Sequence, residues 1–236
     1  MGVRACAAAL RAFSSVLTVA LVTAVMSCSV YTADYSDRRL NTAMNDDSIY
    51  GTHTIQFAPV DIGGLEGCVL VYRAVQADHA HAPGKSVVIV GHIGVLRTPG
   101  QKPILALKIK VRDLVLNPVA TRPHVAYLRS DSWSTARSDW AARDLVDDFR
   151  AFGVALSDDP AVAVLREMLD KAKVTVVVKR TEDDMELQFP LDLMVSNAEP
   201  IPGGTYRRMR SPEGLAKFRR CVEEVLETVF STPRDA

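Results

Sequence analysis

Three residues in one short stretch, Asp78, His79 and His81, have side chains that bind transition metals. They lie in the sequence ADHAHAPG, which shows no apolar periodicity and is typical of a loop between strands. Carboxylate and neutral imidazole are good ligands for zinc, copper or nickel. Three ligands do not close a site, so His53 or His92 would have to join them from elsewhere. Two interpretations follow, a metal site and an ordinary polar loop, and the loop is favoured.

Two further charged segments lie in predicted loops or turns. Gly84-Lys85-Ser86 is similar to the end of a phosphate-binding loop, but His79 stands where that motif needs its first glycine. The segment also precedes a predicted strand, whereas the motif follows one, and we reject it. The acidic stretch at 181–184 reads as a hairpin turn.

A basic row lies along one predicted strand. Lys108, Lys110 and Arg112 alternate with apolar residues, so one face of this strand is predicted to be core and the other basic. The simplest interpretation is a solvated face. If the row is functional, it would contact lipid headgroups or an acidic partner.

Overall charge limits the classes of partner. The chain of 236 residues has 28 Lys plus Arg and 28 Asp plus Glu, hence no net charge. A neutral chain has no general attraction to nucleic acid, and we expect no nucleic-acid partner.

The N-terminus has the pattern of an export signal. No Asp or Glu occurs before Asp34, and an apolar run with four hydroxyl side chains follows Arg4 and Arg11. This run is shorter than the ~20 residues of a membrane-spanning helix. A basic start, an apolar run and a small residue before the break are typical of a secretory signal peptide, predicted here over residues 1–27.

The end of this segment resembles a bacterial lipobox. Cys28 follows an aliphatic residue (Val25), a position that accepts several residue types (Met26) and a small residue (Ser27). Met26 departs from the small or β-branched residue that is usual at its position. The resemblance to lipoprotein precursors implies cleavage before Cys28 and attachment of a diacylglycerol and an acyl chain to that residue. The alternatives are a cysteine that happens to lie in an ordinary secretory signal, and a mitochondrial transit peptide.

Cleavage leaves two unassigned cysteines, because Cys6 is lost and Cys28 is lipidated. Cys68 opens a predicted strand and Cys221 lies on the apolar stripe of the last predicted helix. In an exported protein such a pair could form a disulfide, or both could be small buried side chains.

Strand patterns dominate the first part of the mature chain. Residues 28–48 are predicted to be a flexible tether and 49–236 a single globular domain. Strands are expected at 53–60, 67–75, 86–96, 103–116, 124–130, 173–180 and 185–193, including hairpins across 97–102 and 181–184. Helices are expected over 142–152, after Asp159-Pro160, and after Ser211-Pro212, the last being amphipathic.

Strands and helices in separate blocks favour an α+β fold. The expected architecture is a largely antiparallel sheet with helices packed on one face and a C-terminal amphipathic helix.

These patterns predict a lipid-anchored protein of the bacterial envelope. We expect it in the cell membrane or outer membrane, with its domain in the periplasm or at the cell surface. Its predicted role is non-enzymatic binding of an unknown protein or small ligand. The alternative is an anchored enzyme or metal-binding protein whose site is assembled from dispersed residues.

Overall fold

The structure is a computed structural model that describes residues 53–62, 65–78, 85–98, 100–114, 120–121, 123–135, 141–143, 150–181, 185–201 and 205–230. Every element treated below lies in these ranges. The predicted signal peptide, Cys28 and the tether lie outside them and stay predictions.

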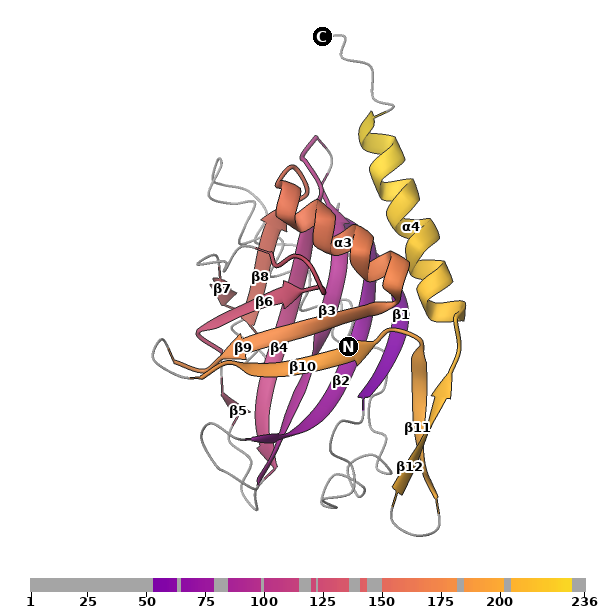
Figure 1. Cartoon of the computed structure of the whole chain (residues 1–236). Coiled ribbons are helices and arrows are strands. Elements are labelled where there is room, and N and C mark those ends of the chain that lie inside the picture. The colour runs from indigo at the N-terminus through magenta and orange to yellow at the C-terminus, as the bar shows by residue number, and fades with distance from the viewer. Residues whose placement is uncertain are drawn as a thin grey trace, which may run out of the picture.

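One large antiparallel sheet forms the back of the molecule in Figure 1. Its strand order is β1-β2-β3-β4-β8-β7, with the short β5 also paired to β4. The strands are β1 (His53–Ile62), β2 (Leu65–Asp78), β3 (Lys85–Arg97), β4 (Ile104–Leu114), β5 (Ala120–Thr121), β7 (Ala141–Arg143) and β8 (Arg150–Ala155). The predicted hairpin across 97–102 is confirmed by the pairing of β3 with β4.

A second sheet covers the inner face of the first. It has the order β10-β9-β6 and consists of β6 (Val125–Arg129), β9 (Lys173–Lys179) and β10 (Leu187–Asp192). The predicted hairpin of 173–193 is confirmed as β9 paired with β10. Its strands cross in front of the large sheet (Figure 1).

Two described helices complete this side of the molecule. Helix α3 (Asp159–Lys171) begins with Pro160 in its first turn and ends at Ala172, which adopts a left-handed conformation. Helix α4 (Glu213–Phe230) packs on β1 and β2 through the apolar stripe that the sequence predicts. Neither described helix is long and apolar enough to span a membrane.

The expected α+β class is therefore wrong. Strands make up 61% and helices 21% of the described residues, so the fold is closer to all-β. The sheet face expected to carry only helices is also covered by the second sheet.

The helix expected at 142–152 accounts for part of this error. Residues 141–143 and 150–155 are strands, and Phe152 pairs with Leu107 of β4. Phe152 is buried on the inner face, where pairing with β4 satisfies its backbone groups. Gly153, expected to end a helix, lies inside β8 opposite Ala106.

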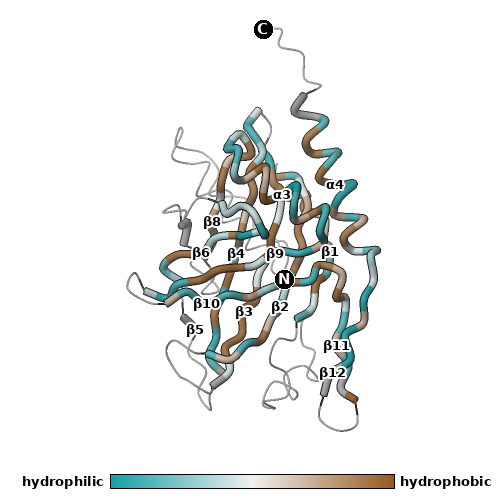
Figure 2. Tube along the Cα trace, viewed as in Figure 1, coloured by the Kyte–Doolittle hydropathy of each residue, from teal (hydrophilic) through white to brown (hydrophobic). Residues whose placement is uncertain are grey.

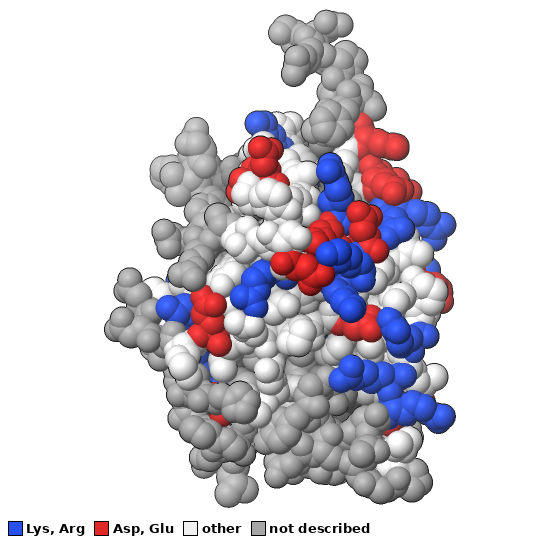
Figure 3. Space-filling model, in the orientation of Figure 1, with Lys and Arg blue, Asp and Glu red and all other residues white. Residues whose placement is uncertain are grey.

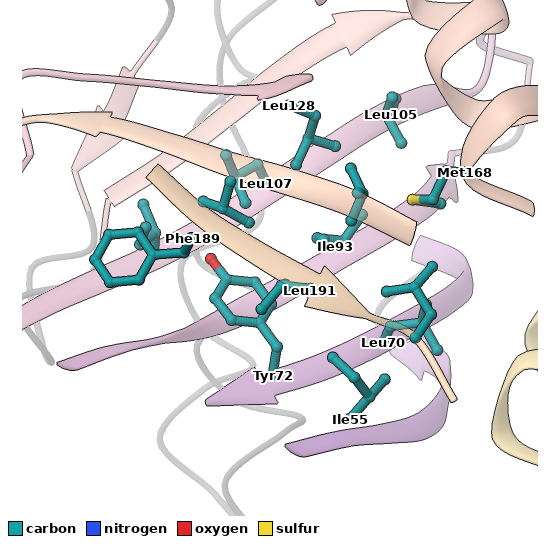
Figure 4. Close-up of a cluster of buried hydrophobic side chains, with 14 of the residues drawn as sticks. Ile55, Leu70, Tyr72, Ile93, Leu105, Leu107, Leu128, Met168, Phe189 and Leu191 are labelled. Carbon is teal, nitrogen blue, oxygen red and sulfur yellow. The ribbon is translucent and has the colours of Figure 1, made fainter. Parts of the chain in front are cut away.

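The core lies between the two sheets and the helices. Apolar colour is concentrated along the facing strands in Figure 2. Figure 4 shows this interface, with side chains from β10 and α3 turned toward those of the large sheet; labelled there are Ile55, Leu70, Tyr72, Ile93, Leu105, Leu107, Leu128, Met168, Phe189 and Leu191.

A close backbone approach in this core requires glycine. The Tyr72 hydroxyl crosses β3 at Gly91 and donates a hydrogen bond to the carbonyl of Lys108, at 3.3 Å. A Cβ at Gly91 would lie 1.9 Å from the Lys108 carbonyl oxygen and 2.7 Å from the Tyr72 hydroxyl. No side chain fits there without moving β4.

The third sheet is a separate hairpin beside the core. Within the described part of the chain, strands β11 (Val195–Ile201) and β12 (Thr205–Arg210) pair only with each other, and β11 also contacts β1. In Figure 1 this hairpin extends away from the body, toward the end of the molecule opposite the C-terminal end of α4. These two strands were not predicted from the sequence.

Candidate functional site

The predicted metal ligand Asp78 is part of a buried ion network. Its carboxylate Oδ2 lies 3.4 Å from Nη2 of Arg180, and the side chain of Asp78 is 1% exposed. Arg180 also donates two hydrogen bonds to Asp113, one of them at 2.9 Å. Arg180 follows β9, so this network joins the second sheet to the ends of β2 and β4.

His79 and His81 lie outside the described residues, so the structure does not test them as ligands. His53 and His92, which would have to join them, are not brought to Asp78. His92 in β3 pairs with Val71 of β2, and His53 in β1 pairs with Ala74 of β2. Along β2, Val71 and Ala74 lie seven and four residues from Asp78. At ~3.3 Å per residue these separations are about 23 and 13 Å. Among the described residues, no group of three His, Cys, Asp or Glu could hold a metal ion.

Each of these two histidines has another role. The His53 Nε2 accepts a hydrogen bond from the Asp192 amide at 2.8 Å, which ties β1 to the end of β10. His92 lies opposite Lys108 on the outer face of the large sheet. Burial, and secondarily the charge of Lys108, lower the pKa of His92 to about 3. His92 is therefore neutral at physiological pH.

The basic row is not the solvated face expected from its sequence. Lys108 and Lys110 are 3% and 7% exposed, and only Arg112 is exposed. Arg73 and His92 add two further basic side chains to the same buried face. Arg73, His92, Lys108 and Lys110 all have interaction partners. This cluster belongs to the interior and offers no open surface to a partner.

Cys68 and Cys221 are joined. Cys68 in β2 and Cys221 in α4 form a disulfide with a Cα–Cα distance of 6.1 Å. Cys68 is fully buried in the main core, and Cys221 packs against that core from the helix. The bond fastens α4 to the large sheet.

A small cavity lies between the two sheets. Its volume is about 10 Å³, and its walls include Leu105 and Phe152 from the large sheet and Leu128 from β6. Such a space holds one water molecule at most. This cavity is too small for an organic ligand.

A turn after β6 is held by α3. The Glu167 carboxylate accepts hydrogen bonds from the hydroxyls of Ser130 and Ser132, from the Ser132 amide and from Lys171. The bonds from Lys171 and Ser130 lower the pKa of Glu167 to about 2. The turn exposes 51% of Trp133. Glu167 and Lys171 could have been recognised from their spacing of four residues in a helix, but the serines could not.

The β11–β12 hairpin presents the most distinctive exposed surface. Arg207, Arg208, Met209 and Arg210 are all exposed, so charged and apolar side chains are interleaved along β12. We call residues 195–210 the arginine hairpin. Gly203-Gly204 was the signal that could have located it, since a glycine pair between two runs is typical of a tight hairpin turn.

Comparison of the chain with protein families, with curated proteins and with solved structures found no match.

Proposed function

We propose that this chain is an exported lipoprotein, held at a bacterial membrane by acyl chains on Cys28, whose β-rich domain acts by binding. The N-terminal pattern that ends at Ser27-Cys28 motivates the anchor. More than one acyl chain is needed for stable anchoring, and a diacylglycerol plus an amide-linked chain meets that requirement.

The observation that carries the proposal is the Cys68–Cys221 disulfide. It comes from the folded domain and is independent of the N-terminal pattern. Disulfides persist in the periplasm and at cell surfaces, while the bacterial cytosol keeps most thiols reduced. Both features thus favour the same compartment.

The described ionisable clusters favour a binding role over catalysis. Arg180 joins the two sheets through Asp78 and Asp113, and Glu167 holds the turn after β6. These groups make structural contacts. The arginine hairpin, by contrast, is exposed and rich in groups that recognise anions.

Acylation of Cys28 tests the proposal. The full chain is expressed in a bacterial host and its intact mass and N-terminal peptide are measured. We expect the wild-type protein to start at an acylated Cys28 and to enter the detergent phase of a Triton X-114 separation. Cys28→Ala should abolish both properties.

Cys6→Ala provides the matched control, because Cys6 lies inside the predicted signal peptide and should not affect acylation. An unmodified mature N-terminus at another residue would refute the anchor.

A further inference from the structure

Charge is distributed very unevenly near the end of the chain. Residues 195–220 contain six Lys or Arg and two Asp or Glu, an excess of four positive charges in a chain with no net charge. The next seven residues contain Glu223, Glu224 and Glu227 and no basic residue. The sign of the charge therefore reverses along α4.

The fold separates these charges in space. In Figure 3, Lys and Arg gather over β12 and the first turns of α4, and Asp and Glu lie near the other end of that helix. The arginine hairpin and the acidic end of α4 point to opposite ends of the molecule in Figure 1. On this face the arginine hairpin and the first turns of α4 are therefore basic, and the second half of α4 is acidic.

Apolar side chains accompany the arginines. The register pairs Met209 with Asn197, and Ile201 with Thr205, which places Met209, Arg207 and Ile201 on one face of the hairpin. Met209 and Ile201 are 44% and 37% exposed. The opposite face contains Arg208, which is paired with the buried Ala198, and Arg210. Exposed arginines therefore occur on both faces of the hairpin, and Met209 and Ile201 lie with Arg207 on one of them.

Two ion pairs of the hairpin have largely exposed arginines. Arg207 lies 4.0 Å from Glu199 and Arg210 lies 3.0 Å from Asp192, with the arginine side chains 70% and 54% exposed. Exposed pairs of this kind contribute little. A guanidinium has five N–H donors, so one carboxylate contact leaves donors for a phosphate oxygen.

The start of β1 lies at the base of this hairpin. The His53 ring contacts the backbone of Asp192, three residues before β11 begins. The chain that leads from Cys28 therefore joins the domain beside the arginine hairpin.

We propose that the arginine hairpin contacts the anionic surface of the membrane, with its arginines on lipid phosphates and Met209 and Ile201 at the edge of the acyl region. This inference takes its partner, a membrane, from the proposed function. Cationic side chains near an anionic bilayer and apolar side chains at its interface both favour binding. The acidic end of α4 then points away from the bilayer.

The test uses the mature chain from Ser29 to Ala236 without acyl chains, so that binding reports the protein surface alone. This chain contains every described element, the main core and both bonded cysteines. Sedimentation is measured with vesicles of phosphatidylcholine alone and of phosphatidylcholine mixed with phosphatidylglycerol. We expect binding to the anionic vesicles, weakening as salt is added.

The decisive comparison is between two triple variants, each of which removes three positive charges from a different part of the surface. Arg207→Gln/Arg208→Gln/Arg210→Gln should lower the partition coefficient for anionic vesicles by roughly 100-fold, since each basic residue near the surface contributes about 5-fold. The matched control is Lys102→Gln/Arg112→Gln/Arg166→Gln, at exposed positions outside the hairpin. It should lower the partition coefficient only slightly.

Equal losses in both variants would overturn the proposal, because net charge and not the hairpin would then control binding. Absence of binding to anionic vesicles would also overturn it, and the arginines would then serve only to protect the edge of β12 from pairing with other strands. Neither outcome depends on acylation of Cys28, which the intact mass reports separately.

Discussion

Reduction of the Cys68–Cys221 disulfide should remove a large part of the stability of the domain. The bond closes a loop with a sequence separation of 153. The loop-closure entropy of the unfolded chain then gives a stabilisation of about 5 kcal/mol at 25 °C. Domains of this kind are stable by roughly 5–15 kcal/mol, so the loss is a substantial fraction of the total.

Urea unfolding of oxidised and reduced wild-type protein measures this contribution, because both forms contain the same atoms in the core except for the bond. We expect a lower midpoint after reduction. We also expect a steeper dependence on urea, since the unfolded chain without the cross-link exposes more surface.

A double variant, Cys68→Ala/Cys221→Ala, separates cross-linking from packing. Cys68 is fully buried, so its loss adds the cost of a small cavity to that of the bond. The variant should therefore be slightly less stable than reduced wild type. Identical midpoints for oxidised and reduced protein would refute the reasoning, as would a peptide map in which Cys68 and Cys221 occur unlinked.

Two further predictions concern buried charge. Arg180→Met should cost roughly 3 kcal/mol, because it removes the cation that Arg180 supplies to buried Asp78 and to Asp113. Arg97→Met, at the partly exposed pair with Glu66, should cost less, about 1 kcal/mol. Equal losses in urea unfolding would contradict this. The pKa of His92 is lowered from 6.5 to about 3, so the unfolded state takes up a proton below pH 6.5 and the folded state does not. The stability that His92 contributes is fully present above pH 6.5 and falls as the pH drops toward 3, by up to ~1.4 kcal/mol per pH unit, and His92→Gln should remove this slope from the free energy of unfolding. A wild-type slope that persists unchanged in the variant would refute the assignment.

The sequence predicted the strands whose apolar residues alternate, and it failed where the outcome depends on distant partners. In β4, Leu105, Leu107 and Ile109 are all buried as expected. The same alternation could not show that Lys108 and Lys110 are buried too, because it separates the two faces of a strand without stating what covers each. An antiparallel strand with one polar face is usually solvated on that face, and here it is not.

The surroundings of Asp78 also depend on a residue distant in the sequence. Asp78 reads as a ligand in its local sequence, yet its partner Arg180 is 102 residues away. The helix was expected at 142–152 from a spacing of apolar residues, and such a spacing is ambiguous in a short segment. The pairing of β8 with β4 makes residues 150–155 a strand. The disulfide was accessible to sequence analysis because the predicted cleavage and lipidation would leave only Cys68 and Cys221 to be paired, and Cys221 lies on a clear helical stripe.

The charges of α4 support the orientation proposed for the domain. Acidic residues favour the first turn of a helix and basic residues the last, by a few tenths of a kcal/mol each, because of the helix dipole. Helix α4 has Glu213 in its first turn, but its basic residues Lys217, Arg219 and Arg220 follow at once and its last turn has no basic residue. Part of this order has a local reason, because Arg219 and Arg220 stand four residues before Glu223 and Glu224, a spacing at which opposite charges stabilise a helix. The helix dipole gives no reason for it. The proposed anionic surface on the side of the arginine hairpin would attract the first half of α4 and repel the second.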